Sequence, residues 1–527
     1  MALVQLNDIC FEVKDRTLFT IKHLDIQHKD RIGLVGANGS GKTSLLRIIA
    51  KEEQQFHGSA VLHGKPALLP QLKPQSQHKS GGEVSKMLID KIFAEAQDLL
   101  LMDEPTTYLD TEITEKIEQE LQKRSEAMII TSHDRAFLDT LCTKIWEIDE
   151  GKVRVYNGNY SDYEQQKKEA EERHAKEYEK YVQEKAQLEE AVQLKEQKAQ
   201  KATKKPKNLS SSEARITGAK PHFAKKQKKL NQGALAMQSR LKHLNKVEKP
   251  KAVAPVKMQV AKEEKLRNRV IIRGQQVEGK MGERILWSKV NFSITSGDKI
   301  GITGANGSGK TTFLLKILNQ KDGITVSPAV TFGYFSQMLE VLNTKDSVME
   351  NMKASSVQNE TIMRTVLARL GFIGEEVFKP VHVLSGGERV KAALAKLFVS
   401  SANVLVLDEP TNFLDITAVK ALEALLIDYS GTVLFITHDR RLLANAATKL
   451  FILKEQQLIP FEGPLSAHEE TPGPQKHEHL EDELLQVETS IAEVLSRLSI
   501  KPAPELDEEF QSLLARKKAL INQIEEN

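Results

Sequence analysis

The chain has few cysteines, few aromatic residues and no long apolar segment. It contains 2 cysteines and 2 tryptophans in 527 residues, and aromatic side chains make up 5% of it. Cys10 and Cys142 are too few for a disulfide framework, which is consistent with a reducing cytosol. No stretch approaches the roughly eighteen apolar residues that a membrane helix needs, and the first residues lack the features of a signal peptide. We therefore expect a cytoplasmic protein with no membrane partner.

One set of motifs occurs twice. GANGSGKT stands at residues 36–43 and 304–311, SGGE at 80–83 and 385–388, Asp-Glu-Pro at 103–105 and 408–410, and Ser/Thr-His-Asp-Arg at 132–135 and 437–440. The first SGGE residue precedes the Asp by 23 residues in both halves (103−80, 408−385), and the Asp precedes the His by 30 (133−103, 438−408). A single phosphate-binding loop can occur in an inert fold, but this repeated order predicts two ATP-handling domains.

The first motif, GANGSGKT, matches the GxxxxGK[ST] pattern of a phosphate-binding loop. Its backbone N–H groups surround phosphates, and its glycines permit the close approach that side chains would block. We predict two ATP-binding sets: Gly36, Asn38, Gly39, Ser40, Gly41, Lys42, Thr43 and Ser44 in the first half, and Gly304, Asn306, Gly307, Ser308, Gly309, Lys310, Thr311 and Thr312 in the second. The predicted Mg²⁺ environment consists of Thr43, Gln71 and Asp103 in the first set and Thr311, Gln337 and Asp408 in the second.

Acidic and imidazole side chains complete each set. Glu104 and Glu409 directly follow the Mg²⁺-binding aspartates, where a carboxylate can act as general base on the attacking water. His133 and His438 are predicted to contact the γ-phosphate. These four residues are the predicted catalytic groups of an ATPase.

The ordered set resembles the ATP-binding cassette family, in which SGGE is the diagnostic element. The resemblance implies that the SGGE of one domain completes the ATP site of the other, so that Ser385, Gly386, Gly387 and Glu388 cover the first loop and Ser80, Gly81, Gly82 and Glu83 the second. A monomer with its two domains paired is then expected. The family's base-stacking aromatic would be Phe11 in the first half, whereas the second half has Met281.

Composition divides the chain into four parts. Short β-branched runs alternate with helical stretches in residues 1–162 and 266–463, which predicts two α/β domains, each a mostly parallel sheet covered by helices. Within residues 163–265, apolar residues recur at heptad-compatible steps before and after a basic turn, which predicts an antiparallel helical hairpin as linker. Residues 464–527 are predicted to form a C-terminal helical extension.

The turn of the predicted hairpin is strongly basic. Residues 201–230 hold nine lysines and Arg215 against the single acid Glu213, a net charge of +9. An isolated charge run is usually a solvated loop, but its place at a hairpin tip favours contact with RNA phosphates. The predicted residues of RNA contact and of the linker tip are Lys204, Lys205, Lys207, Ser211, Ser212, Arg215 and Lys220.

The first domain is also unusually short after its phosphate loop. From Gln71 to SGGE there are 9 residues in the first half, against 48 from Gln337 in the second (80−71, 385−337). In transporter cassettes the helical subdomain at this place grips the membrane partner, so its near absence argues against the ATPase subunit of a drug exporter. The translation-factor members of the F subfamily insert an extra arm here, for which this chain has no room.

Tandem cassettes joined by a charged helical linker resemble the F subfamily, and within it the Vga-type antibiotic-resistance proteins. The most specific part is the linker segment 196–230, beside DEPTTYLD at 103–110 and DEPTNFLD at 408–415. The resemblance implies binding to the 70S ribosome, with the linker entering from the tRNA exit site toward P-site tRNA and 23S rRNA of the peptidyl transferase centre. It implies protection from pleuromutilins, lincosamides and streptogramin A. A housekeeping translation factor is the alternative.

Overall fold

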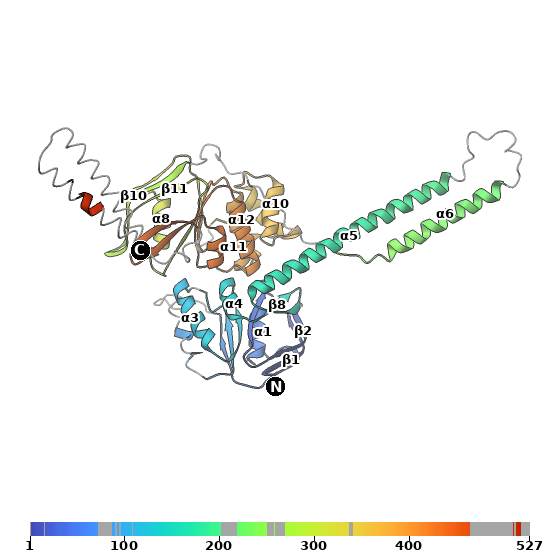
Figure 1. Cartoon of the computed structure of the whole chain (residues 1–527), viewed down its shortest axis with the longest axis horizontal. Helices are drawn as coiled ribbons and strands as arrows, with labels where there is room; N and C mark the ends of the chain where they lie inside the picture. The colour runs from blue at the N-terminus through green and yellow to red at the C-terminus, as the bar shows by residue number, and fades with distance from the viewer. Residues whose placement is uncertain are drawn as a thin grey trace.

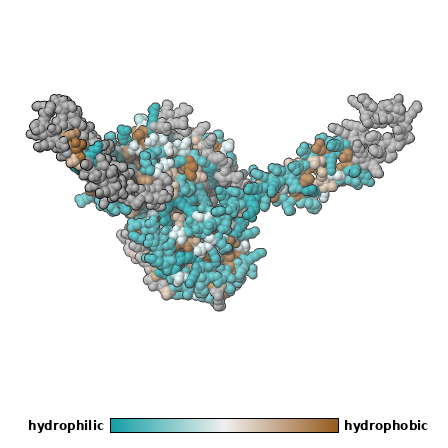
Figure 2. All heavy atoms as spheres, in the orientation of Figure 1, coloured by the Kyte–Doolittle hydropathy of each residue, from teal (hydrophilic) through white to brown (hydrophobic). Residues whose placement is uncertain are grey.

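A computed structural model gives two α/β domains in contact and a long helical arm that projects from them (Figure 1). It describes residues 2–14, 16–71, 87–89, 92–93, 96–107, 109–201, 219–249, 258, 269–336, 341–463, 510 and 513–517. Among these residues, no helix combines the length and the apolar character that crossing a membrane requires. The visible face of both domains is mostly hydrophilic (Figure 2).

The first domain is built on one nine-stranded sheet with the order β4-β1-β2-β9-β8-β3-β7-β6-β5. Its central strands are continuous apolar runs that are buried on both faces, as expected of parallel strands between helices. The strands are β1 Val4–Val13, β2 Arg16–Ile26, β3 Arg31–Gly36, β4 His57–Leu62, β5 Pro66–Leu69, β6 Leu99–Asp103, β7 Ala127–Thr131, β8 Lys144–Asp149 and β9 Lys152–Asn157, and the helices are α1 Lys42–Ile49, α3 Thr111–Lys123 and α4 Arg135–Leu141.

The second domain repeats this plan with two sheets, ordered β11-β10-β13 and β14-β15-β16-β12-β17-β18. Its strands are β10 Val270–Met281, β11 Arg284–Thr295, β12 Lys299–Gly304, β13 Ile324–Val326, β14 Phe332–Phe335, β15 Val404–Asp408, β16 Thr432–Ile436, β17 Lys449–Lys454 and β18 Gln457–Glu462. Its helices are α8 Lys310–Leu318, α9 Val348–Lys353, α10 Glu360–Arg369, α11 Gly386–Val399, α12 Ile416–Asp428 and α13 Arg440–Ala446, with 3₁₀ turns η2 Gly374–Phe378 and η3 Val381–Val383.

The domains differ most in the segment that contains SGGE, which lies between β5 and β6 in the first domain and between β14 and β15 in the second. In the second domain, α9, α10 and α11 fill the interval from β14 to β15, residues 336–403. The corresponding interval of the first domain, from β5 to β6, spans only residues 70–98. The short interval cannot contain a helical subdomain of the same size.

The arm consists of α5 Tyr160–Lys201 and α6 Ala219–Lys242, which lie side by side (Figure 1). Val192, Ala199 and Ala234 are buried between them, and Gln238 donates a hydrogen bond to Glu196 across the pair, 2.9 Å. The predicted hairpin is therefore confirmed. Helix α5 begins three residues earlier than predicted (163−160), within the sheet domain. Of the predicted C-terminal extension, only residues 510 and 513–517 are described, and they are helical.

Candidate ATP sites between the two domains

The two phosphate-binding loops have the same geometry. Each follows a central strand, β3 or β12, and leads into α1 or α8, so the loops lie at the carboxyl edge of the sheets. In the first loop Lys42 Nζ donates to the carbonyl oxygens of Gly36 and Ala37, at 2.8 and 3.2 Å. Lys310 repeats this pattern at 2.8 and 3.1 Å. The lysines thus fold back across loops that are already shaped to surround an anion.

A glycine is required where each loop enters its helix. Gly41 has φ 100°, in the left-handed region, and a Cβ built on it would stand 2.7 Å from the Phe19 ring. Gly309 has φ 103° and would meet Trp287 at 2.9 Å. A side chain at either position would combine backbone strain with a steric clash.

Two of the three predicted Mg²⁺ ligands, Thr43 and Asp103, are in contact in the first domain. Thr43 Oγ1 donates to Asp103 Oδ2 at 2.7 Å, and Asp103 Oδ1 accepts a second bond from Thr131 Oγ1 at 2.6 Å. Gln71 lies just beyond β5 and is exposed. In the second domain, burial raises the pKa of Asp408, although a hydrogen bond from Thr311 opposes the shift. Hydroxyl and carboxylate oxygens of this kind fit Mg²⁺ held beside a bound nucleotide.

The glutamates that follow these aspartates have an unusual backbone conformation. Glu104 and Glu409 have φ 54° and 49°, a region that is uncommon for residues other than glycine and that points to a functional constraint. Glu104 Oε1 lies 3.2 Å from His133 Nε2, and Glu409 Oε1 lies 3.3 Å from His438 Nε2. Each predicted base is therefore held next to its predicted γ-phosphate sensor.

Burial changes the titration of the second pair. It raises the pKa of Glu409 to about 7, and burial together with the nearby Lys310 lowers the pKa of His438 to about 4. A carboxylate with a pKa near 7 is well suited to accept a proton from water at neutral pH. The imidazole stays neutral there.

Several buried polar atoms in the two sites fit a ligand that carries donors and acceptors. Ser40 Oγ, Ser308 Oγ and Glu104 Oε1 are buried and have no hydrogen-bond partner among the described residues. Such atoms cost free energy unless something bonds them. Two of these atoms, Ser40 Oγ and Ser308 Oγ, belong to the phosphate loops. A bound nucleotide, with its Mg²⁺ and the attacking water, would supply hydrogen-bond partners for all three.

Each site is completed by the opposite domain. Asp415 Oδ2 accepts a hydrogen bond from the backbone N–H of Asn38, 3.3 Å, and Asp110 Oδ2 accepts one from Asn306, 3.0 Å. The second SGGE forms the N-terminus of α11, and a Cβ at Gly387 would lie 3.4 Å from Asn38 Nδ2. The second SGGE therefore lies at the first phosphate loop, as the resemblance implied.

Two arginines, the buried Arg135 and the half-buried Arg440, reinforce this contact between domains. Arg135 Nη2 donates to Glu423 at 2.6 Å, and Arg440 donates to Glu118. The two contacts are related by one offset of 305 residues (440−135, 423−118). Both arginines lie two residues after the site histidines, so the histidine loops and the domain interface are physically connected.

The adenine contact predicted for Phe11 stays a prediction. Phe11 is 6% exposed, and its ring stacks on Phe19 with centroids 5.6 Å apart. One face of the Phe11 ring is therefore in contact with Phe19. Other predicted site residues lie outside the described residues: Ser80, Gly81, Gly82, Glu83, Gln337, Lys204, Lys205, Lys207, Ser211, Ser212 and Arg215. Lys220 lies in the first turn of α6.

The residues that join the domains are not among the predicted site residues. Four of them belong to segments that occur in both halves. The last residues of DEPTTYLD and DEPTNFLD are Asp110 and Asp415, and the last residues of SHDR and THDR are Arg135 and Arg440. The repetition of these residues in both halves could have marked them as functional. Their partners, however, are hundreds of residues away in the chain and are identified only by the structure of the two domains in contact.

We expect a pH-dependent stability effect at Glu409. Its folded-state pKa of about 7 lies above the ordinary value of 4.5, so ionisation of this carboxyl opposes folding as pH rises from 4.5 through 7. Without nucleotide, Glu409→Gln should therefore stabilise the protein at pH 8.5 by about 1–3 kcal/mol. Thermal unfolding at pH 8.5 and pH 6 measures this. The gain should shrink at pH 6; a gain independent of pH, or one shared by the exposed Glu455→Gln control, would contradict the assignment.

Unequal turnover of the two sites is a second expectation. Arg389 Nε donates to the carbonyl oxygen of Leu384 at 3.1 Å and so anchors the second SGGE, whereas the first SGGE is followed by Val84, which cannot make this bond. The first phosphate loop, covered by the second SGGE, should hydrolyse ATP faster. Glu104→Gln should therefore lower steady-state ATPase activity more than Glu409→Gln; equal losses, or the reverse order, would refute this.

Comparison with known proteins identifies the motif set. The family model described as ABC transporter matches residues 20–79 and 287–412, and a second model with the same description matches 146–223. "Erythromycin resistance ATP-binding protein MsrA" of Staphylococcus epidermidis is 32% identical over 86% of this chain and 98% of its own. "Ribosome protection protein VmlR" of Bacillus subtilis is 31% identical over 99% of both chains.

More distant relatives extend the comparison. "ABC transporter F family member 5" of Arabidopsis thaliana is 32% identical over 73% of this chain and 52% of its own. Among solved structures, "RNase-L Inhibitor" matches with a TM-score of 0.57 and 17% identity, covering 87% of this chain and 90% of that one. At that identity the structural likeness supports the fold of two tandem ATP-binding domains.

Proposed function

Because this chain belongs to the F subfamily of the ATP-binding cassette proteins, we propose that it is an ATPase that protects the ribosome from antibiotics. It binds the ribosome while ATP holds its two domains together, and it leaves after hydrolysis. The observation that carries the proposal is the arm of α5 and α6, which projects from the closed pair of domains (Figure 1). An arm with a basic connecting segment suits contact with folded RNA.

The residues of the two sites support the ATPase part of the proposal. Lys42 and Lys310 would neutralise phosphate charge, and Thr43 with Asp103 would hold Mg²⁺, which stabilises the charge of the transferred phosphoryl group. Glu104 and Glu409 would take the proton of the attacking water. Because each site uses residues of both domains, ATP binding favours closure and hydrolysis releases it.

The arm is proposed to act at the peptidyl transferase centre of the 70S ribosome. It would enter from the tRNA exit site and bring residues 202–218 toward P-site tRNA and 23S rRNA. The expected drug classes are pleuromutilins, lincosamides and streptogramin A. The name of the relative MsrA adds erythromycin to the drugs to be tested.

A test combines expression with ribosome binding. Expression in a susceptible bacterium should raise the inhibitory concentration of at least one of these drugs, and the protein should cosediment with ribosomes in ATP. The double variant Lys42→Met with Lys310→Met, which removes the phosphate-neutralising cations, is the control and should lose both effects. Cosedimentation without any change in drug tolerance would instead support a housekeeping translation factor, and absence of both would refute ribosome binding.

A further inference from the structure

The root of the arm is anchored in the first domain. The Ser161 backbone N–H and hydroxyl donate to Asp139 of α4, at 2.7 and 3.0 Å. Tyr160 is 0% exposed and Tyr163 is 5% exposed. Tyr163 also donates to the buried Glu147 of β8 at 2.7 Å. Helix α5 therefore starts as part of the first domain and does not hang from a free linker.

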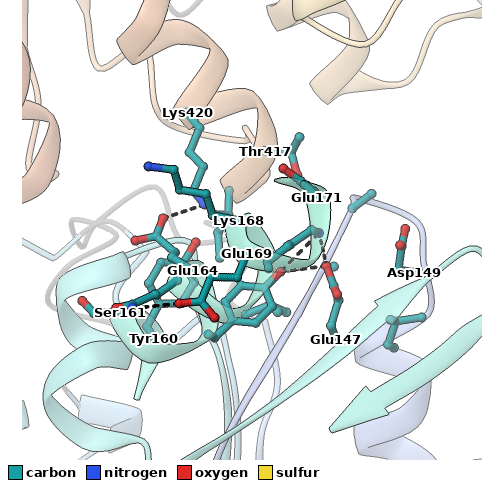
Figure 3. Close-up of a pocket in the computed structure, with 18 of the residues that line it drawn as sticks. Glu147, Asp149, Tyr160, Ser161, Glu164, Lys168, Glu169, Glu171, Thr417 and Lys420 are labelled. Atoms are coloured by element: carbon teal, nitrogen blue, oxygen red, sulfur yellow. Dashed lines mark hydrogen bonds and ion pairs between the residues drawn. The ribbon is translucent and has the colours of Figure 1, made fainter. Parts of the chain in front are cut away.

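The second domain also holds this root, mainly through Glu164, while Arg441 Nη2 lies 3.1 Å from Asp139 Oδ2 of α4 as well. Glu164 Oε1 lies 2.6 Å from Lys420 Nζ of α12, and Glu164 Oε2 accepts from Arg441 Nη1 of α13 at 2.8 Å. Arg441 Nη2 donates to Ser161 Oγ at 2.7 Å as well. The Tyr160 ring lies beside both cations, 5.6 Å from Lys420 Nζ and 5.3 Å from Arg441 Cζ. Figure 3 shows Lys420 reaching from the second domain to Glu164 beside Tyr160.

These bonds keep the carboxylate charged. Burial alone would raise the pKa of Glu164, but the bonds from Lys420 and Arg441 outweigh it and lower the pKa. Isolated surface ion pairs contribute little. Here one carboxylate accepts from two cations in a half-buried setting, beside an aromatic ring that attracts both.

The two cations break the symmetry of the domain interface. At the offset of 305 residues that relates Arg440 to Arg135, Arg441 corresponds to Ala136 (441−136) and Lys420 to Glu115 (420−115). Closure of the domains over two equivalent ATP sites explains why some interface residues occur in both halves. Arg441 and Lys420 are not shared, and they stand where the second domain meets the arm root.

A cavity of about 890 Å³ lies next to this contact. It is lined by Gly36 and Ala37 of the first phosphate loop, by Tyr160 and Glu164 of α5, and by Lys420 of the second domain. The arm root, the first ATP site and the second domain therefore meet around one space. Separation of the domains would open it.

We propose that Glu164 and Tyr160 are the docking point through which the second domain sets the direction of the arm. Lys420 and Arg441 hold α5 in one direction while the domains are closed, and they release it when the domains separate. The proposal rests on the proposed function in one respect: it takes ATP binding to be what closes the two domains. These four residues are positioning residues and take no part in hydrolysis.

The length of the arm makes this contact consequential. Helix α5 has 42 residues and is therefore about 60 Å long, so a tilt of about 10° at its root moves its far end by about 10 Å. A displacement of this size would separate a productive position of the connecting segment from an unproductive one. Small changes at Glu164 are thus amplified at the tip.

Distance measurements between spin labels test the proposal without ribosomes. Labels at Val182→Cys on the exposed side of α5 and Ile427→Cys on α12 report the direction of the arm, and labels at Val61→Cys and Ile427→Cys report closure of the domains. Cys10→Ser removes the more accessible native cysteine. The background is Glu104→Gln with Glu409→Gln, so that ATP is retained.

In ATP we expect one narrow arm distance for the parent protein. Arg441→Ala with Lys420→Glu, the residues that the first half carries, should abolish the narrow arm distance but leave the closure distance intact. The matched control Arg440→Ala breaks an interdomain ion pair that does not touch the arm, and it should shift both distances together. Adding Glu164→Lys to Arg441→Ala with Lys420→Glu exchanges the charges of the Glu164–Lys420 pair and should restore the narrow distance.

Two results would overturn the proposal: an unchanged arm distance in Arg441→Ala with Lys420→Glu, or a loss of closure in that variant equal to the loss in Arg440→Ala. Ribosome cosedimentation of the same variants separates this proposal from the function on which it rests. If the arm distance responds as expected while the parent protein does not bind ribosomes, the docking point stands and the ribosome-protection function fails.

Discussion

Replacing Glu104 and Glu409 together by glutamine is expected to lower ATP hydrolysis by about 10²–10⁴-fold and to leave ATP binding intact. Glutamine has the size of glutamate but does not accept the proton of the attacking water. In the first site, Glu104 Oε2 also accepts a hydrogen bond from the His133 backbone at 3.1 Å, which an amide oxygen can keep. The phosphate loops and the Mg²⁺ ligands are untouched. Phosphate release and equilibrium nucleotide binding measure the two effects separately.

The same double variant should accumulate in the closed state and should cosediment with ribosomes persistently in ATP, because the step that separates the domains is blocked. Glu120→Gln, an exposed carboxylate on α3, is the matched control and should behave like the parent protein. Loss of nucleotide binding in the double variant would contradict the role of general base, since it would mean that these glutamates hold the nucleotide itself.

The sequence was sufficient for the parts of the structure that depend on local pattern. Continuous apolar runs such as β15 and β16 predicted buried parallel strands, and each phosphate loop follows such a strand as expected. The heptad-compatible steps predicted the two paired helices of the arm, because a helix brings every third or fourth residue to one face. In each case the determining residues are close together in the chain.

Predictions were absent where contacts between distant segments decide the structure. Antiparallel pairing of β1 with β2 sets Phe11 opposite Phe19, a contact that the sequence pattern did not predict. The contacts of Arg135 with Glu423 and of Arg441 with Glu164 span 288 and 277 residues. No spacing rule relates such residues, because the docking of two domains brings them together.

The arm gives a further prediction, which concerns its basic connecting segment. Replacing Lys204, Lys205 and Lys207 by alanine is expected to weaken ribosome association at physiological salt and to reduce its salt dependence by roughly one unit of slope for each RNA phosphate that a lysine no longer neutralises. Cosedimentation across a series of salt concentrations measures both. Three exposed stem lysines of α5, Lys176, Lys180 and Lys185, provide the matched control, and their replacement by alanine should change neither quantity.

Substitutions of Ser211, Ser212 or Arg215 should act differently from those of the lysines. ATPase activity and ribosome association should stay near the parent values while the set of tolerated drugs changes, because this part of the segment is proposed to determine how far the arm reaches, whereas the lysines hold it against RNA. Inhibitory concentrations for each drug class, compared with cosedimentation of the same variants, separate the two roles. If these variants keep the full resistance spectrum, residues 211–215 are only a solvated turn. If resistance falls only in proportion to weaker ribosome binding, these residues contribute to binding as the lysines do. Either result refutes the division of roles.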